Sequence, residues 1–188
     1  MSNTNERKAL PGVMPQFTER WSPRAFLSKS VSEDALARMV EAARWSPSCF
    51  NDQPWRFYTN GQNNFDDYLA CLVEGNQQWA KCAPVLGFIV GARQFSHNGK
   101  ANDWFAFDCG AAWMSLALQA RHEGCYAHAM AGFDAEKAER LLSIGPEEKV
   151  LIAFAVGYLG EPAQLPDELQ SRENPSMRKS LADIWVTK

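Results

Sequence analysis

Two arginines and a serine stand at alternate positions near the start of this chain, at Arg20, Ser22 and Arg24. In an extended backbone alternate side chains point to the same side, so these three groups would share one surface. A guanidinium group offers a planar fork of donors that matches phosphate oxygens and the polar edge of a heterocycle. The segment therefore indicates a candidate anion site, although solvated surface positions are the commoner place for such arginines.

A second polar segment lies between a predicted helix and a predicted strand. Residues 42–55 read A-A-R-W-S-P-S-C-F-N-D-Q-P-W. Pro47 stops the helix, and Pro54 closes a polar turn that carries Ser48 and Asn51. Cys49 in this turn could be a redox thiol, but a packed cysteine is the better interpretation because only Arg44 is a nearby cation in sequence.

A phosphate in this protein would have to be held by side chains. The sequence has neither G-x-x-x-x-G-K-[ST] nor G-x-G-x-x-G after a predicted strand. The basic candidates are Arg20 and Arg24 at one end of the chain and Arg178 and Lys179 at the other. The three histidines do not form H-E-x-x-H and the five cysteines form no C-x-x-C pair, so we expect no metal site.

The composition is that of one globular domain. The 188 residues are 46% hydrophobic and carry a formal net charge of -3, which gives no basic field for nucleic acid. No apolar signal segment is seen in residues 1–19, and the longest apolar run, residues 85–92, is too short to cross a bilayer. The odd number of cysteines favours a reduced, cytoplasmic protein.

The hydrophobic pattern predicts an α+β fold in a single domain, 1–188, with an N-terminal arm (1–15) and a C-terminal extension (161–188). Ser30 and Glu33 form a capping-box pattern before the first helix. The helix over 104–123 is apolar nearly all round and ends at Gly124, so we expect a second subunit to help cover it. Predicted helices are 32–45, 65–71, 104–123 and 134–143, and predicted strands are 55–59, 85–90 and 150–158.

These segments together resemble the FMN-dependent nitroreductase family, in its shorter-chain branch. R-W-S-P-R-A-F (20–26) is similar to the family's R-x-S-x-R-x-F, and residues 43–55 are similar to A-x-x-A-P-S-x-x-N-x-Q-P-W, with Ser46 where alanine is usual. G-N-Q-Q-W-A (75–80) before A-P-V, A-G-F (131–133) after Gly124, and A-V-G-Y (155–158) follow in the family's order. The resemblance covers residues 16–184.

The resemblance implies a mainly antiparallel mixed sheet flanked by helices, in an intertwined homodimer with FMN at the subunit interface. The C-terminal extension would wrap the partner. The residues that it assigns to FMN are Arg20, Ser22, Arg24, Pro47, Ser48, Asn51, Asn76, Ala131, Gly132, Arg178 and Lys179. Pro47, Ser48 and Asn51 would reach the flavin from the other subunit. Many relatives carry glutamate where this chain has Ala131, so the local charge differs.

The resemblance also implies an NAD(P)H oxidoreductase that reduces nitroaromatic, quinone or related acceptors by a ping-pong mechanism. No side chain is expected to be catalytic, because a flavin carries the redox chemistry itself. Trp104 and Phe105 are the candidates for the acceptor pocket, with core packing as the alternative. The competing functions are other flavin chemistry (flavin fragmentation, dehalogenation or dehydrogenation) and a non-catalytic flavin-binding sensor dimer.

Overall fold

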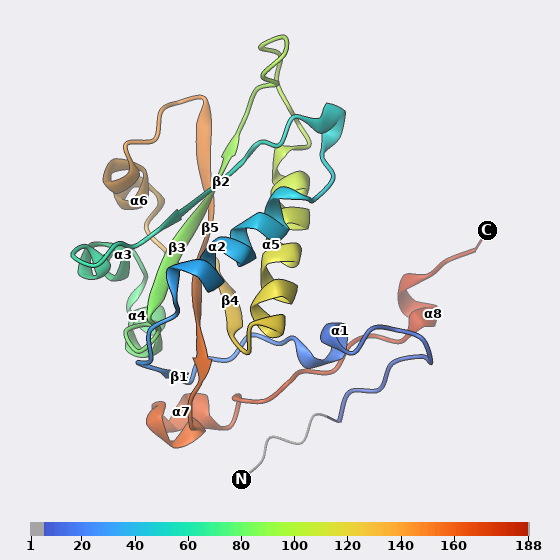
Figure 1. Cartoon of the computed structure of the whole chain (residues 1–188), viewed down its shortest axis with the longest axis vertical. Coiled ribbons are helices and arrows are strands. Elements are labelled where there is room, and N and C mark those ends of the chain that lie inside the picture. The colour runs from blue at the N-terminus through green and yellow to red at the C-terminus, as the bar shows by residue number, and fades with distance from the viewer. Residues whose placement is uncertain (1–5, 188) are drawn as a thin grey trace.

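A five-stranded antiparallel sheet lies between two layers of helices in the computed structural model, which describes residues 6–187 (Figure 1). β5 pairs with β3, β4 and β1, and β3 also pairs with β2. The strands are β1 (Phe26–Leu27), β2 (Trp55–Thr59), β3 (Val85–Ala92), β4 (Tyr126–Met130) and β5 (Glu148–Leu159). The helices are α1 (Gln16–Glu19), α2 (Glu33–Arg44), α3 (Phe65–Ala70), α4 (Glu74–Ala80), α5 (Phe105–His122), α6 (Ala135–Leu142), α7 (Asp167–Gln170) and α8 (Leu181–Ile184), with short 3-10 turns η1 (Cys49–Asn51) and η2 (Pro162–Gln164).

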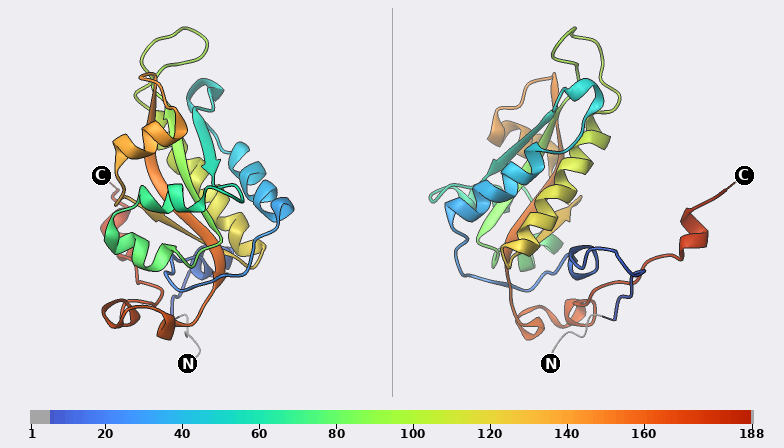
Figure 2. Two further views of the ribbon diagram at one scale, coloured as in Figure 1. Left: turned by 90° about the vertical axis from the view of Figure 1, so that its left-hand side faces the viewer. Right: turned by 45° about the vertical axis from the view of Figure 1, so that its right-hand side comes forward.

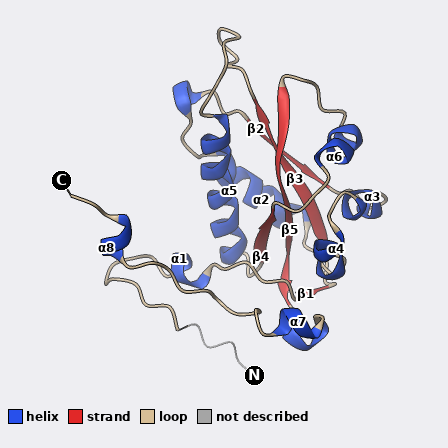
Figure 3. Ribbon diagram, turned by 180° about the vertical axis from the view of Figure 1, so that it is seen from behind, coloured by secondary structure: helices blue, strands red, loops and turns tan. Residues whose placement is uncertain are grey.

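Strand β3 serves two hydrophobic cores because its side chains alternate between the faces of the sheet. Val85 and Ile89 pack with α2 and α5, whereas Leu86 and Phe88 pack with α3, α4 and α6 on the other face (Figure 3). Gly87 lies between them, where a Cβ atom would overlap the ring of Phe154. The expected α+β class and antiparallel sheet are confirmed.

The predicted helices and strands all occur, with ends within two residues of the expected ones. Helix α2 is capped by Ser32, whose side chain accepts a hydrogen bond from the Ala35 N–H. The capping box expected at Ser30 is therefore wrong: the helix begins two residues later. Gly124, with φ +76°, ends α5 as expected.

Several short elements were not expected from the sequence, among them β1, α1, α4 and β4.

Helix α5 is less enclosed than its composition suggests. Cys109, Ala112 and Leu116 face the core, but Phe107 and Gly110 lie on an open side of the helix. Within one chain, α5 therefore keeps an apolar face that no part of residues 6–187 covers.

The two ends of the described chain run side by side below the sheet and away from it (Figure 2). The Arg7 side chain joins them, because its Nε donates to the Ser176 carbonyl at 2.9 Å. Within the described residues, no helix has the length and apolar character needed to cross a membrane.

Candidate functional site

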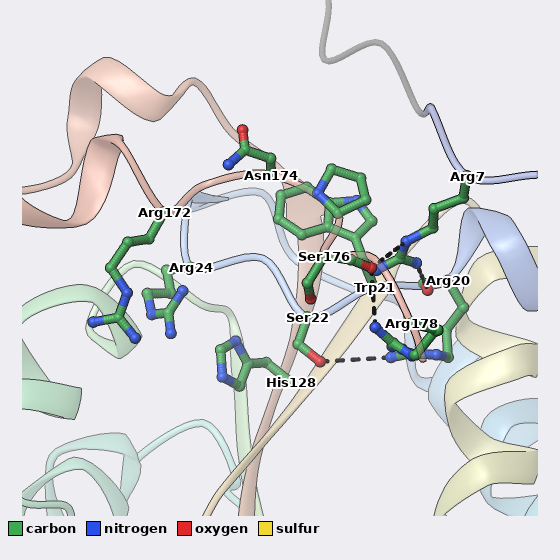
Figure 4. A pocket seen from close by; sticks show the side chains of 11 residues that line it. Arg7, Arg20, Trp21, Ser22, Arg24, His128, Arg172, Asn174, Ser176 and Arg178 are labelled. Carbon is green, nitrogen blue, oxygen red and sulfur yellow. Dashed lines mark hydrogen bonds between the residues drawn. The ribbon is translucent and has the colours of Figure 1, made fainter. Parts of the chain in front are cut away.

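A cavity of about 440 Å³ lies between the two chain ends, the segment before β1 and strand β4 (Figure 4). Its walls come from the arm before α1, the segment that leads into β1, strand β4 and the segment after α7. Five arginines line it, together with six other residues. The lining is Arg7, Arg20, Trp21, Ser22, Arg24, His128, Arg172, Asn174, Pro175, Ser176 and Arg178.

Hydrogen bonds to the backbone hold the arginine-bearing segments in place. The buried carboxylate of Glu173 accepts hydrogen bonds from the N–H groups of Arg24 and Ala25 at 2.7 and 2.8 Å. Arg7 donates to the Arg20 carbonyl at 2.8 Å. These contacts tie residues 20–25 to both chain ends, and the alternation expected from the sequence brings Arg20, Ser22 and Arg24 to one cavity.

The charges in this cavity are unbalanced. Burial and the neighbouring Arg178 lower the pKa of Arg20, and burial and Arg172 lower the pKa of Arg24 against the opposing effect of Glu173. Burial, Arg178 and Arg20 lower the pKa of Arg7 in the same way. Since no acidic residue is among the described residues that line the cavity, an anion is the ligand that its electrostatics favour.

His128 forms part of the same wall. Its Nδ1 lies 2.7 Å from the Pro23 carbonyl oxygen, and its ring packs against that of Trp79 at 4.6 Å between centroids. Burial, with a smaller contribution from the cations of Arg24 and Arg20, lowers the pKa of His128 to about 4 against the opposing effect of the hydrogen bond to Pro23. The imidazole is therefore neutral at pH 7.

A second polar feature lies one helical turn from Trp79. Asn76 Nδ2 donates to the Gly132 carbonyl at 2.9 Å, and the Val73 N–H donates to the same oxygen at 3.1 Å. A Cβ atom on Gly132 would stand 2.8 Å from Asn76 Nδ2 and from Val73 Cγ2, so a larger residue here would displace these side chains. Ala131 is exposed beside it. Buried Trp79 connects this feature to the arginine cavity, because its ring packs against that of His128.

The turn after α2 is positioned elsewhere, at the opposite end of the sheet (Figure 1). Phe50, Asn51 and Gln53 all have positive φ, a conformation that costs energy in residues with side chains. The turn is held by the buried carboxylate of Asp108, which accepts from the Cys49 N–H at 3.1 Å, and by Ser48 Oγ, which accepts from the Gln53 N–H.

A shallow apolar pocket of about 220 Å³ adjoins this turn. It is lined by Pro47, Ser48, Cys49, Trp104, Phe107 and Asp108. Trp104, which was expected to line a pocket, lines this one together with Phe107. Phe105 does not line this pocket, because its ring packs close to Gly91 in β3.

The structure divides the residues expected to bind FMN into three groups. Arg20, Ser22, Arg24 and Arg178 share the cavity, whereas Lys179 lines the neighbouring cleft between the arm and the tail. Asn76, Ala131 and Gly132 form the second group. Pro47, Ser48 and Asn51 lie in the distant turn.

Sequence reasoning missed four cavity residues of clear chemical interest: Arg7, His128, Arg172 and Ser176. Arg172 and Arg178 are six residues apart in a polar tail, a charge pattern that could have marked them as a pair. His128 carried no signal, because its role follows from the packing of β4 against residues 20–25.

Comparisons with known proteins agree on one family. The model of the nitroreductase family matches residues 17–73 and 63–158. A Ralstonia nicotianae protein, "Putative NADH dehydrogenase/NAD(P)H nitroreductase RSc1004", is 26% identical over 168 residues, which are 79% of this chain and 86% of the relative.

Solved structures show the same fold. A crystal structure described as an oxidoreductase containing FMN is 41% identical, with a TM-score of 0.92 over 99% of this chain and 96% of that chain. A nitroreductase family protein from Streptococcus pneumoniae TIGR4 has a TM-score of 0.74 at 19% identity, over 92% of this chain and 98% of that chain.

Proposed function

This chain belongs to the nitroreductase family, and from that premise we propose that it is an FMN-dependent oxidoreductase. Its electron donor is NADH or NADPH, and its acceptors are nitroaromatic, quinone or related compounds reduced in a ping-pong cycle. The fold neighbour that contains FMN and the relative named for NAD(P)H support the cofactor and the donor. The observation that carries the proposal is the arginine cavity.

The cavity fits the phosphate of FMN. A phosphate monoester carries about -1.5 to -2 charges at pH 7 and three acceptor oxygens. Arg20, Arg24 and Arg178 would hold it with Ser22, and Arg172 adds a cation that the sequence did not suggest. The dianion would offset the burial and the repulsion between arginines, which together lower the pKa values of Arg20 and Arg24. Bidentate contacts between guanidinium and phosphate would fix its orientation as well as its affinity.

Around the flavin ring, the chain supplies orientation and donors rather than a nucleophile or a base. When bound, FMN supplies the hydride and electron transfer chemistry. Asn76 and the backbone of Ala131 and Gly132 would meet the polar parts of the ring, with Asn76 held in place by its bond to the Gly132 carbonyl. Lys179 would act from outside the cavity, through long-range attraction for the phosphate.

We propose a homodimer because the turn with Pro47, Ser48 and Asn51 lies far from the arginine cavity within one chain. In a dimer this turn would complete the partner's site, as would the pocket beside Trp104. Its strained backbone suits a ligand-binding role, since Phe50 and Asn51 hold positive φ at a cost. The tail would wrap the partner, because α8 and the residues after it expose Leu181, Ile184 and Trp185 away from the body of their own chain (Figure 2).

The face that we assign to the dimer is the open side of α5. A cleft of about 330 Å³ runs between this helix and the sheet, and its lining is almost entirely apolar. Exposed apolar surface of this kind is typical of protein interfaces. The lining is Ile89, Ala106, Cys109, Gly110, Trp113, Ala129, Leu151 and Ile152.

Spectroscopy of the purified protein tests the enzyme assignment. We expect a yellow protein whose flavin absorbance bleaches anaerobically with NADH or NADPH and returns when an acceptor is added. Retained colour without bleaching would refute the oxidoreductase function and favour a flavin-binding sensor. A colourless protein that takes up no FMN would refute both. A stopped-flow screen of nitroaromatics, quinones and enones against the reduced protein then identifies the acceptor class.

A substitution at Gly110 tests the dimer face. Apart from the two adjacent residues and the backbone of α5 itself, no described atom lies within 4 Å of the position that a Cβ atom would take there, so a side chain fits the isolated chain. In sedimentation experiments Gly110→Glu should be monomeric and Gly110→Ala dimeric, because only the former places a charge in the apolar interface. A Gly110→Glu dimer as tight as the wild type would exclude this face.

A further inference from the structure

His128 is a histidine whose two ring nitrogens have different tasks. Its Nδ1 lies 2.7 Å from the carbonyl oxygen of Pro23. A carbonyl can only accept a hydrogen bond, so Nδ1 must carry the proton in the neutral ring. The ring is held further by Trp79, 4.6 Å away between centroids. Nε2 therefore carries the lone pair, and it is the atom at which the ring gains a second proton.

The charged groups around His128 are almost all cations. Arg20 and Arg24 belong to the segment that also supplies Pro23, Arg172 and Arg178 come from the tail, and Arg7 comes from the arm. The α4 contact, Trp79, is uncharged. Glu173 is the acidic residue near the group, and its carboxylate is bound to the backbone of Arg24 and Ala25. Figure 4 shows the imidazole projecting toward Arg24 and Arg172.

The net effect of the neighbouring charges on the pKa of His128 changes sign when a phosphate binds in the cavity. With the cavity free of anions, burial and the cations of Arg24 and Arg20 hold the pKa of His128 at about 4. A phosphate dianion would place two negative charges among the same groups. Opposite charges a few ångströms apart raise the pKa of a histidine, and a hydrogen bond from Nε2–H to a phosphate oxygen raises it further.

We propose that His128 is a ligand of the FMN phosphate and that binding of this phosphate is coupled to the uptake of one proton from solvent at Nε2. The proposal rests on the proposed FMN site. Before binding, Nε2 of the neutral ring carries a lone pair and no proton, so it cannot donate a hydrogen bond to phosphate. After binding, the imidazolium donates from Nδ1 to the Pro23 carbonyl and from Nε2 to a phosphate oxygen. No other group needs to move a proton.

Two variants separate the task of Nε2 from the structural task of Nδ1. The amide of asparagine can place an N–H near the position of Nδ1, so His128→Asn can keep the bond to Pro23 and loses the group that titrates. His128→Gln can place an N–H near the position of Nε2, and it does not titrate either. FMN dissociation constants are measured by quenching of flavin fluorescence between pH 5.5 and 8.5, with riboflavin as the ligand that lacks phosphate.

The expected result is a pH dependence that belongs to His128 and to phosphate. The ratio of the FMN dissociation constant of His128→Asn to that of the wild type should rise as the pH falls from 8 to 6, by up to about tenfold per pH unit. His128→Gln should bind FMN more tightly than His128→Asn at pH 8 and show no such rise. Riboflavin affinity should show no difference in pH dependence between the proteins. Taking this ratio cancels the titration of the FMN phosphate itself, whose second pKa is about 6.

A ratio that stays constant with pH, while FMN still binds more tightly than riboflavin, would overturn the proposal and leave the FMN site standing. FMN that binds no more tightly than riboflavin at any pH would instead refute the proposed function. Calorimetry of the wild type at pH 7, in two buffers of different ionisation enthalpy, needs no variant. Proton uptake with FMN and none with riboflavin supports the coupling, and release or no exchange with FMN overturns it.

Discussion

Replacing Arg20 by methionine should weaken FMN binding without weakening the fold. Within residues 6–187, the side chain makes one hydrogen bond, a long one of 3.5 Å from Nη1 to Ser22 Oγ. Burial and Arg178 lower its pKa, so its charge is disfavoured where it lies. Methionine keeps an unbranched apolar stem and removes the guanidinium. The backbone carbonyl that Arg7 uses is unchanged.

The magnitude follows from what a charged contact with phosphate contributes. A hydrogen bond to a charged group contributes about 1.5–3 kcal/mol, which corresponds to an FMN dissociation constant raised about 10- to 150-fold. The free energy of unfolding of the FMN-free protein should stay the same or rise by no more than about 1 kcal/mol, because a repulsive charge is removed and solvent screens part of its effect.

Fluorescence titration gives the affinity, and urea unfolding of the FMN-free protein gives the stability. Lys179→Met is the matched control, because Lys179 lies outside the arginine cavity. We expect its FMN affinity to fall less than about threefold. The reasoning is refuted if Arg20→Met binds FMN with the affinity of the wild type. It is also refuted if Arg20→Met has a lower free energy of unfolding than the wild type and Lys179→Met is the variant with the larger loss of FMN affinity.

Three further outcomes follow from the same geometry. Because the pKa of His128 is about 4 in the folded protein and 6.5 in an ordinary histidine, the unfolded chain binds a proton first as the pH falls. The unfolding free energy of the FMN-free protein should therefore drop by at most about 3 kcal/mol between pH 6.5 and 4, and His128→Asn should lack this part of the loss. Gly132→Ala should displace the Asn76 amide, since the new Cβ atom would stand 2.8 Å from it; we expect urea unfolding to show a loss of about 1–3 kcal/mol, and FMN affinity to fall with it. Trp104→Ala and Phe107→Ala should raise the KM for aromatic acceptors at unchanged FMN content, and steady-state kinetics with an unchanged KM would show that this pocket does not hold the acceptor.

The long elements could be predicted because their signals are local. The pattern over α2 and β5 and the breaks at Pro47 and Gly124 depend on neighbouring residues alone. Strand β4 was missed because its segment, Y-A-H-A-M, contains two alanines, which are depleted in strands, and no β-branched residue; it pairs along the edge that β5 offers. The sequence offers two serines as the N-cap of α2, and the spacing alone does not distinguish them. In the structure the Ala35 N–H donates to Ser32, so Ser32 and not Ser30 is the cap.

The candidate site was predictable only where it was contiguous. Arg20, Ser22 and Arg24 share a surface because an extended backbone alternates its side chains. Arg172 and His128 meet them from distant parts of the chain, through the buried carboxylate of Glu173 and the carbonyl of Pro23. Such contacts are set by tertiary packing, which spacing in the sequence does not encode. Phe105 and Phe107 show the same limit. They are two residues apart in α5, yet Phe105 packs against β3 and Phe107 is exposed beside the turn.

The most direct test of the arginine cavity compares two ligands that differ by one phosphate. The dissociation constants of FMN and riboflavin are measured for the wild-type protein under the same conditions. Two or more charged contacts to phosphate should make FMN bind at least about 100-fold more tightly than riboflavin. Equal affinities would contradict the assignment of this cavity to the phosphate.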